Sequence, residues 1–183
     1  MALKNQVPII SHLHNNPPWI KKFGYKTLAY NFASRYLDYI LMVSDAVKDD
    51  YRYSNKIKCP VSIVGNPFSV EAVKAQLSAN TASEDISSDL LFVGRLTEQK
   101  DPLLFCQVAK RAIGQNIVAT VRIVGHGDLY PEIDAYIKDN HLSGRIILEG
   151  FTKNAYDYMA HTKILMMPSK WEGFGLVALE AMA

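Results

Sequence analysis

The chain has 183 residues, 49% of them hydrophobic and 21% charged, and a net charge of +2, which is the composition of one globular domain or two small ones. No apolar run reaches the 18 residues of a membrane-spanning helix, and the first residues lack the charged-then-apolar pattern of a secretory signal. Cys59 and Cys106 lie far apart and show no metal-binding spacing, so we expect two reduced thiols in a cytoplasmic protein.

Three short apolar runs in the first half of the chain are predicted to be strands. They cover residues 7–14, 39–44 and 61–66. Between the first two runs, Leu28, Phe32 and Tyr36 recur at the i, i+4, i+8 spacing of a helix. Ser44 is the expected N-cap of a further helix that extends through Tyr53.

The second half alternates four predicted strands with four predicted helices. The strands cover residues 89–94, 118–125, 145–150 and 163–168, and the helices cover residues 101–114, 129–140, 154–161 and the segment from 174 onward. In the first of these helices, Asp101 is the expected N-cap, Pro102 the first helical residue and Gly114 the stop. Because the strands are apolar without alternation, helices should cover both faces of their sheet. The pattern predicts an α/β fold with a doubly wound parallel sheet.

The segment between the two halves is polar and rich in Ser and Ala, and it predicts a helix followed by a loop. We place the domain boundary in this segment because few contacts are expected to cross it. The predicted organisation is a first domain at residues 1–68, a linker at residues 69–88 and a second domain at residues 89–183.

The loops that follow the four strands of the second half should gather at one rim, because parallel sheets bind ligands at the carboxyl ends of their strands. These loops read GRLTEQK from position 94, GHGD from position 125, GFTKN from position 150 and PSKWEGFG from position 168. Gly94, Gly125 and Gly127 would let the backbone approach a ligand closely. GHGDL matches only part of the dinucleotide-binding fingerprint, since its third glycine is absent.

Four charged side chains in and after these loops have the chemistry of a nucleotide-sugar site. Arg95 offers a planar fork of donors and Lys100 a compact charge, and both suit a diphosphate. The helix that follows the GFG sequence would point its free N–H groups at phosphate. Glu172 and Glu180 can accept hydrogen bonds from the hydroxyl groups of a sugar and a ribose. Taken singly, each residue reads as an exposed charge or a helix-dipole partner, but their placement on one sheet edge favours a site.

Several segments resemble the donor-binding domain of retaining GT-B glycosyltransferases of family 4. These segments are FVGRLTEQKDP, RIVGHGD, LEGF and PSKWEGFGLVALEAMA, in which Glu172 and Glu180 match the E-x7-E motif of that family. In the first half, SHLHNNPPW resembles the histidine loop of the acceptor domain, and YILMVSDAV and VSIVGNPF resemble the segments that follow it. Members of the family begin earlier and continue further. The resemblance therefore implies two Rossmann-like domains, an acceptor-side one and a donor-binding one, both incomplete here.

The resemblance implies that most of the candidate residues bind the donor. Arg95 and Lys100 would bind its diphosphate, and Glu180 its ribose. The remaining donor-binding residues form the backbone around the ligand: Gly94, Gly125, Gly150, Phe151, Gly173, Phe174 and Gly175. Among them, Gly150 and Phe151 would lie near the base, and residues 173–175 would hold the donor sugar together with Glu172.

The expected catalytic residues are His14, Glu172, Arg95 and Lys100. By the resemblance, His14 would lie near the reacting carbon; an ordinary strand-end histidine, and His12 in its place, are the alternatives. The chain contains no Asp-x-Asp sequence of the kind that holds a divalent cation, so we expect no metal site and no cofactor besides the nucleotide-sugar co-substrate. The two cations would stabilise the leaving diphosphate instead. Retention of the anomeric configuration follows from the resemblance alone.

Two other functional classes remain open at this point. The chain could be a non-catalytic fragment that binds a nucleotide sugar or a glycan, and we expect these 183 residues to be inactive by themselves because an incomplete sheet leaves an edge exposed. A dinucleotide-dependent oxidoreductase is disfavoured by the incomplete glycine motif and by the missing acidic residue after the expected second strand.

The charge is uneven, with a net +5 in residues 1–60 and −3 in residues 61–183. The positive part includes PPWIKKFGYK at residues 17–26, whose cations and rings suit contact with anionic lipid at the membrane periphery. A solvated face with a few packed rings is the favoured alternative. The expected partners are a nucleotide-sugar donor and a glycan or lipid-linked acceptor, and no nucleic acid.

Overall fold

A computed structural model describes residues 7–79 and 86–183. The chain divides into two compact units, the first formed by Met1–Pro67 with Trp171–Gly175 and the second by Phe68–Lys170 with Leu176–Ala183. Each unit is built on its own parallel sheet. The predicted fold class, two parallel α/β sheets, is therefore confirmed.

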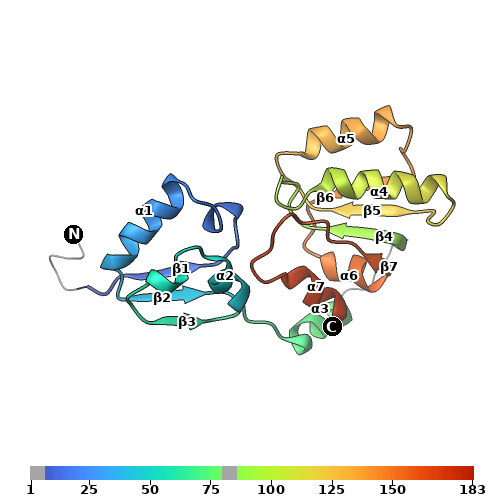
Figure 1. The fold of residues 1–183 in the computed structure, drawn as a ribbon. Coiled ribbons are helices and arrows are strands. Elements are labelled where there is room, and N and C mark those ends of the chain that lie inside the picture. The colour runs from blue at the N-terminus through green and yellow to red at the C-terminus, as the bar shows by residue number, and fades with distance from the viewer. Residues whose placement is uncertain (1–6, 80–85) are drawn as a thin grey trace. The chain divides into compact units, whose positions relative to one another are not determined.

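The first unit has a sheet of three parallel strands in the order β1-β2-β3 (Figure 1). Ile10 pairs with Tyr39, and Ile40 with Val61. The strands are β1 Ile10–Leu13, β2 Tyr39–Met42 and β3 Val61–Ile63, and the helices are η2 Pro18–Ile20, α1 Tyr25–Ala33, η3 Ser34–Tyr36, α2 Asp45–Asp50 and η4 Ser54–Lys56. All three predicted strands are present, each shorter than its apolar run.

The core of the first unit lies on one face of its sheet. Ile40 and Met42 are fully buried on this face of β2, with Val47 of α2 and Tyr51 packed beside them. Burying a side chain of this size contributes about 1.5–3 kcal/mol relative to leaving it exposed. Burial raises the pKa of Tyr51 to about 12, so its hydroxyl stays neutral.

Helix α1 forms where the sequence predicts a helix, but the repeated apolar residues do not face the core. Leu28, Phe32 and Tyr36 are all exposed, whereas Thr27 is buried and Tyr30 packs against the core. The Thr27 hydroxyl bonds to the carbonyl oxygen of Trp19 across 2.5 Å, which satisfies this buried polar group. Helical spacing shows which residues share a face, and tertiary packing decides whether that face turns inward.

The second unit has a sheet of four parallel strands in the order β6-β5-β4-β7. Its strands are β4 Ser88–Val93, β5 Val121–Val124, β6 Ile146–Gly150 and β7 Thr162–Leu165, and its helices are α3 Val70–Ala79, α4 Pro102–Gly114, α5 Tyr130–Asp139, α6 Ala155–Ala160 and α7 Leu176–Met182. Helix α3 lies within the expected linker 69–88 and strand β4 begins at its last residue, whereas residues 80–85 of the linker lie outside the described residues.

Helices cover both faces of the second sheet, as the unalternating strands predict. Leu90 and Phe92 of β4 pack with α4 and α5 on one face, whereas Leu91 and Val93 pack with α6 and α7 on the other. Figure 1 shows α4 and α5 on one side of this sheet and α6, α7 and α3 on the opposite side. This two-sided burial explains why β4 reads as a continuous apolar run.

Helix α4 begins as the sequence indicates. The Asp101 side chain accepts a hydrogen bond of 3.3 Å from the backbone N–H of Leu104, and Pro102 is the first helical residue. Gly114 is the last residue of the helix, one position before its C-cap Gln115. Because these signals fix the start of α4, they also fix the end of the loop between β4 and α4, which carries three of the candidate residues, Gly94, Arg95 and Lys100.

Candidate donor-binding site

A cavity of about 270 Å³ opens at the carboxyl ends of β4, β5 and β6. The residues that line it come from the three loops after these strands and from the start of α6: Val93, Gly94, Arg95, Val124, Gly125, His126, Phe151, Thr152 and Ala155. Four of the predicted donor-binding and catalytic residues, Gly94, Arg95, Gly125 and Phe151, therefore line the same cavity. This rim is where open parallel sheets bind nucleotides.

Three of the candidate glycines are joined by backbone hydrogen bonds across this rim. The Gly94 N–H donates to the carbonyl oxygen of Val124 across 3.0 Å, and the Gly125 N–H donates to that of Gly150 across 2.8 Å. Gly125 has φ of 145°, and a Cβ placed on it would lie 1.9 Å from the Gly94 carbonyl oxygen. A side chain at this position would drive the first two loops apart, so the rim needs glycine there.

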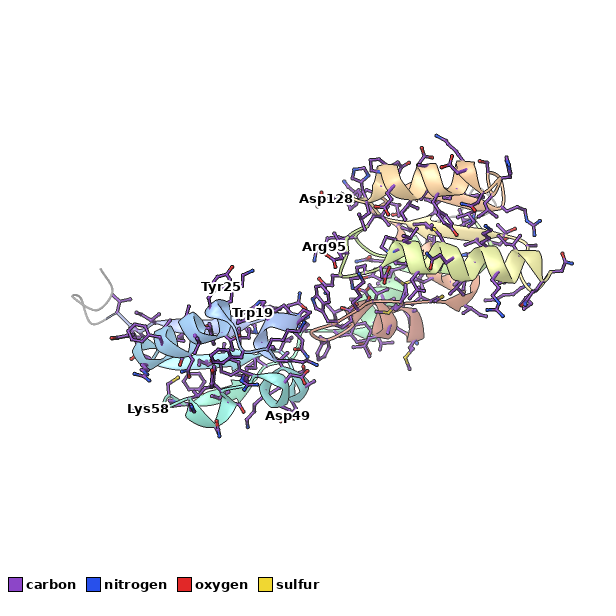
Figure 2. The ribbon with its side chains drawn as sticks, turned by 45° about the horizontal axis from the view of Figure 1, so that its top comes forward. Trp19, Tyr25, Asp49, Lys58, Arg95 and Asp128 are labelled. Carbon is purple, nitrogen blue, oxygen red and sulfur yellow. The ribbon has the colours of Figure 1, made fainter. Side chains whose placement is uncertain are left out.

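Arg95 and Lys100 lie on the same loop, between β4 and α4. Arg95 lines the cavity and is exposed, at the same edge of the second unit as Asp128 from the loop after β5 (Figure 2). The aliphatic part of Lys100 lies over Gly94, with its Cδ and Cε atoms 3.8 Å from where a Cβ of that glycine would stand. Both cations thus belong to the loop that forms one wall of the cavity.

Glu180 lies on α7 and is half-buried beside α6. The Tyr156 hydroxyl donates a hydrogen bond of 3.3 Å to Glu180 Oε1. Burial and the nearby carboxylate raise the pKa of Tyr156, so this hydroxyl is a donor at neutral pH. Tyr156 follows Ala155, which lines the cavity, so the contact ties Glu180 to the cavity wall through the first turn of α6.

The glycine-rich segment of the E-x7-E motif packs within the first unit, against the histidine loop. A Cβ on Gly173 would lie 2.6 Å from the His14 carbonyl oxygen and 3.0 Å from the Cα of Asn15. Phe174 packs against Gly65, and Glu172 is half-buried beside Gly173 in the same segment. The structure therefore brings His14 and the predicted sugar-binding segment together in one unit.

The two histidines that are alternatives for the catalytic role lie side by side. His12 is in β1, and His14 directly follows that strand. The ring centroids of His12 and His14 are 4.0 Å apart. Partial desolvation, and then the nearby His14, lower the pKa of His12. Because two positive charges at this distance repel each other, a charge on the His14 ring disfavours the charged form of His12.

Sequence reasoning missed two polar residues that line the cavity, His126 and Thr152, and also Tyr156, which contacts Glu180. His126 stands between the two glycines of GHGD, and its ring packs on that of Tyr130 with centroids 5.0 Å apart. Its position inside a glycine-rich rim loop was the available signal. Tyr156 had no such signal, because its contact with Glu180 depends on how α6 and α7 pack.

In residues 7–79 and 86–183, no helix is both long and apolar enough to cross a membrane. Within the same ranges, no three His, Cys, Asp or Glu side chains gather as ligands for one metal ion.

Comparison with known proteins identifies a family for the second half of the chain. Residues 87–183 match the model of the family described as glycosyl transferases group 1. An uncharacterized glycosyltransferase of Methanocaldococcus jannaschii is 26% identical over 99% of this chain and 47% of its own length. The Escherichia coli UDP-Gal:alpha-D-GlcNAc-diphosphoundecaprenol alpha-1,3-galactosyltransferase is 30% identical over 66% of this chain and 34% of its own length.

Solved structures share the fold of both units. TarM of S. aureus, determined in a complex that contains UDP, has a TM-score of 0.74 at 17% identity, over 96% of this chain and 35% of its own. HepE of Anabaena, in complex with UDP, has a TM-score of 0.73 at 19% identity, over 99% of this chain and 52% of its own. The chain spans about a third to a half of the length of these relatives. It has the GT-B fold of two parallel α/β units, and it belongs to the family of glycosyl transferases group 1.

Proposed function

We propose that the full-length protein is a glycosyltransferase, which moves a sugar from a nucleotide-diphosphate sugar to a hydroxyl group of a glycan or lipid-linked acceptor. One observation carries this proposal: a single cavity at the strand ends is lined by Gly94, Arg95, Gly125 and Phe151. A backbone-lined rim with a cation suits a diphosphate, and an adjoining aromatic ring suits a base.

The names of the relatives support the choice of donor and acceptor. The E. coli relative is named for a UDP-galactose donor and a diphosphoundecaprenol acceptor, and a Campylobacter jejuni relative, 33% identical over 63% of this chain, is also named for an acceptor on diphospho-undecaprenol. We therefore propose that the donor is a UDP sugar. The proposed acceptor is a glycan or a lipid-linked molecule at the cytoplasmic side of a membrane.

The proposed mechanism assigns leaving-group stabilisation to the loop between β4 and α4. Arg95 and Lys100 would bind the diphosphate as negative charge develops on it, so the transfer would need no metal ion. Glu180 would accept hydrogen bonds from the ribose, and Glu172 with residues 173–175 would hold the sugar. His14, whose carbonyl oxygen adjoins Gly173, would lie beside the reacting carbon. We propose retention of the anomeric configuration on the strength of the family resemblance.

The test is transfer by the full-length protein from a panel of UDP and GDP sugars, with an excess of EDTA in one arm and Mg²⁺ in the other. We expect turnover with a UDP sugar at equal rates in both arms, and a product whose anomeric proton coupling in NMR matches that of the donor. Rates that collapse in EDTA would contradict metal independence. Tight binding of UDP without turnover of any sugar would favour a non-catalytic binding protein.

We further propose that the first unit contacts anionic lipid at the membrane periphery through the surface formed by α1 and the turn before it. Phe23, Tyr25 and Phe32 are 69%, 78% and 59% exposed, and Figure 2 labels Tyr25 on this surface. Each ring has a cation 5.9 Å from its centroid. Arg52 lies over Phe23, Lys26 over Tyr25 and Arg35 over Phe32. Exposed rings paired with cations match the interfacial zone of an anionic bilayer.

A further inference from the structure

The segment Trp171–Gly175 rests on the carboxyl ends of the strands of the first unit. It makes a polar contact with Ser44, two positions after the end of β2. The Ser44 hydroxyl donates a hydrogen bond of 2.9 Å to the carbonyl oxygen of Gly173. Val43, the residue before Ser44, adds an apolar contact, since its Cγ1 lies 3.2 Å from where a Cβ of Gly173 would stand.

This hydrogen bond corrects the expectation that Ser44 caps α2. Ser44 does occupy the N-cap position, with extended backbone angles, but its side chain makes no capping bond to the helix. A serine at this position ordinarily bonds to a backbone N–H one turn on, and such a cap stabilises the helix. The hydroxyl instead bonds to a residue 129 positions away along the chain.

Residues that follow the other two strands, β3 and β1, also pack against the segment Trp171–Gly175. Gly65 follows β3, and a Cβ placed on it would lie 3.0 Å from the ring of Phe174, closer than carbon atoms pack without strain. His14 follows β1, and its carbonyl oxygen occupies the space that a Cβ on Gly173 would need. Both glycines therefore leave room for close packing of the segment against the sheet.

We propose that Ser44 is a positioning residue for the donor sugar, and this inference rests on the proposed function. By fixing the Gly173 carbonyl group, Ser44 fixes the position of the neighbouring Glu172 carboxylate against the sugar. Gly65 supports the same arrangement through Phe174. Because a misplacement of about 1 Å can cost up to about 100-fold in rate, a single hydrogen bond to this segment has a large effect on turnover.

The first experiment compares Ser44→Ala with Ser34→Ala in the full-length protein. Ser34 is a matched control, since its buried hydroxyl bonds to the Asn31 carbonyl oxygen across 2.8 Å in the same unit. For Ser44→Ala we expect kcat to fall about 10- to 100-fold while the donor KM changes less than about 3-fold. Ser44→Thr keeps the hydroxyl and should recover most of this loss. Ser34→Ala should leave kcat within about 2-fold.

A second readout does not depend on transferase activity. In Ser44→Ala, hydrogen exchange at the backbone amides of Phe174 and Gly175 should accelerate relative to the wild type and to Ser34→Ala. Unchanged exchange at these amides would overturn the inference, as would equal losses of kcat in the two alanine variants. If the wild type transfers no sugar, the proposed function fails, and the exchange comparison still decides whether Ser44 positions the segment.

A double-mutant cycle tests the contribution of Gly65. Gly65→Ala adds a methyl group against the Phe174 ring and should lower kcat, whereas in a Phe174→Leu background the same change should have a smaller effect. Effects that simply add would show that Gly65 does not act through Phe174 and would overturn this part of the inference.

Discussion

The Tyr156 hydroxyl donates a hydrogen bond to Glu180 Oε1 across 3.3 Å, which links α6 to α7 at the residue expected to bind the ribose. Tyr156→Phe removes this bond and leaves the ring in place. Because one hydrogen bond contributes about 0.5–1.5 kcal/mol, we expect UDP to bind about 2- to 10-fold more weakly, measured by isothermal titration calorimetry. Glu180→Ala, which also removes the proposed hydrogen-bond acceptor for the ribose, should weaken binding more.

Tyr136→Phe is the control for this comparison. Tyr136 lies on α5 and packs against the core on the opposite face of the same sheet. Tyr136→Phe should leave the affinity for UDP unaltered. If Tyr156→Phe binds UDP like the wild type while Glu180→Ala does not, the tyrosine does not orient the carboxylate.

Gly125→Ala should disrupt the rim of the cavity. The added methyl group would overlap the Gly94 carbonyl oxygen, 1.9 Å away, and the residue would also keep a positive φ. We expect a loss of at least about 2 kcal/mol in the free energy of unfolding, measured by urea denaturation, together with loss of UDP binding. Gly144→Ala is the matched control, because Gly144 also has positive φ but no atom within 4 Å of an added Cβ. Equal destabilisation by the two changes would show that backbone strain, not overlap, sets the cost.

The sequence predicts those parts of the fold whose signals are local. Asp101 and Pro102 mark the start of α4, and the unalternating run at residues 89–94 indicates a strand covered on both faces. The rim position of Gly94 and Gly125 also follows from the sequence, because parallel strands place the loops after them at one edge.

Contacts between distant segments could not be predicted in this way. The face of α1 that turns inward depends on what packs against it, so the repeat of Leu28, Phe32 and Tyr36 gave a helix but not its orientation. Ser44 has the local signature of an N-cap, yet its hydroxyl bonds to Gly173. A sequence pattern cannot show that a closer partner from elsewhere in the chain competes for the same hydroxyl.

The lowered pKa of Asp89 predicts that the free energy of unfolding of the second unit decreases at acid pH. A hydrogen bond from Lys163, followed by bonds from the backbone N–H groups of Ala119 and Thr120, lowers the pKa of Asp89 to about 2. A lowered pKa means that this stabilisation is complete above the ordinary value of 3.8 and is lost as the pH falls from there towards about 2. Asp89→Asn should lower the free energy of unfolding by about 1–3 kcal/mol at pH 7 and by less at pH 2.5, measured by urea denaturation.

Asp134→Asn is the comparison for this measurement. Asp134 forms an i,i+4 ion pair with Lys138 on the surface of α5, where solvent screens the charges, so the pair contributes little to stability. The two variants should therefore differ clearly at pH 7. A stability difference between wild type and Asp89→Asn that stays constant from pH 7 to 2.5 would contradict the assignment.

The proposed lipid contact predicts a loss of vesicle binding when the exposed rings on α1 and in the turn before it are removed. In the triple change Phe23→Ser, Tyr25→Ser and Phe32→Ser, co-sedimentation with vesicles of phosphatidylcholine and phosphatidylglycerol should fall at least about 10-fold, because each buried ring contributes about 1 kcal/mol or more. Ile117→Ser removes an equally exposed apolar residue, 69% exposed, from the second unit and should not change binding. Retention of binding by the triple variant would overturn the proposed contact.

The most direct test of the whole account is UDP binding by calorimetry in Arg95→Ala and Lys100→Ala, beside Arg111→Ala and Lys110→Ala. The two control residues are exposed in the second half of α4, and Arg111 lies roughly 14 Å along the helix from its first residue. A charged hydrogen bond is worth about 1.5–3 kcal/mol, so each rim variant should bind UDP about 10- to 100-fold more weakly than the wild type. The controls should match the wild type. UDP affinity that survives the loss of Arg95, or that falls equally in the controls, would contradict the assignment of this cavity to the donor diphosphate.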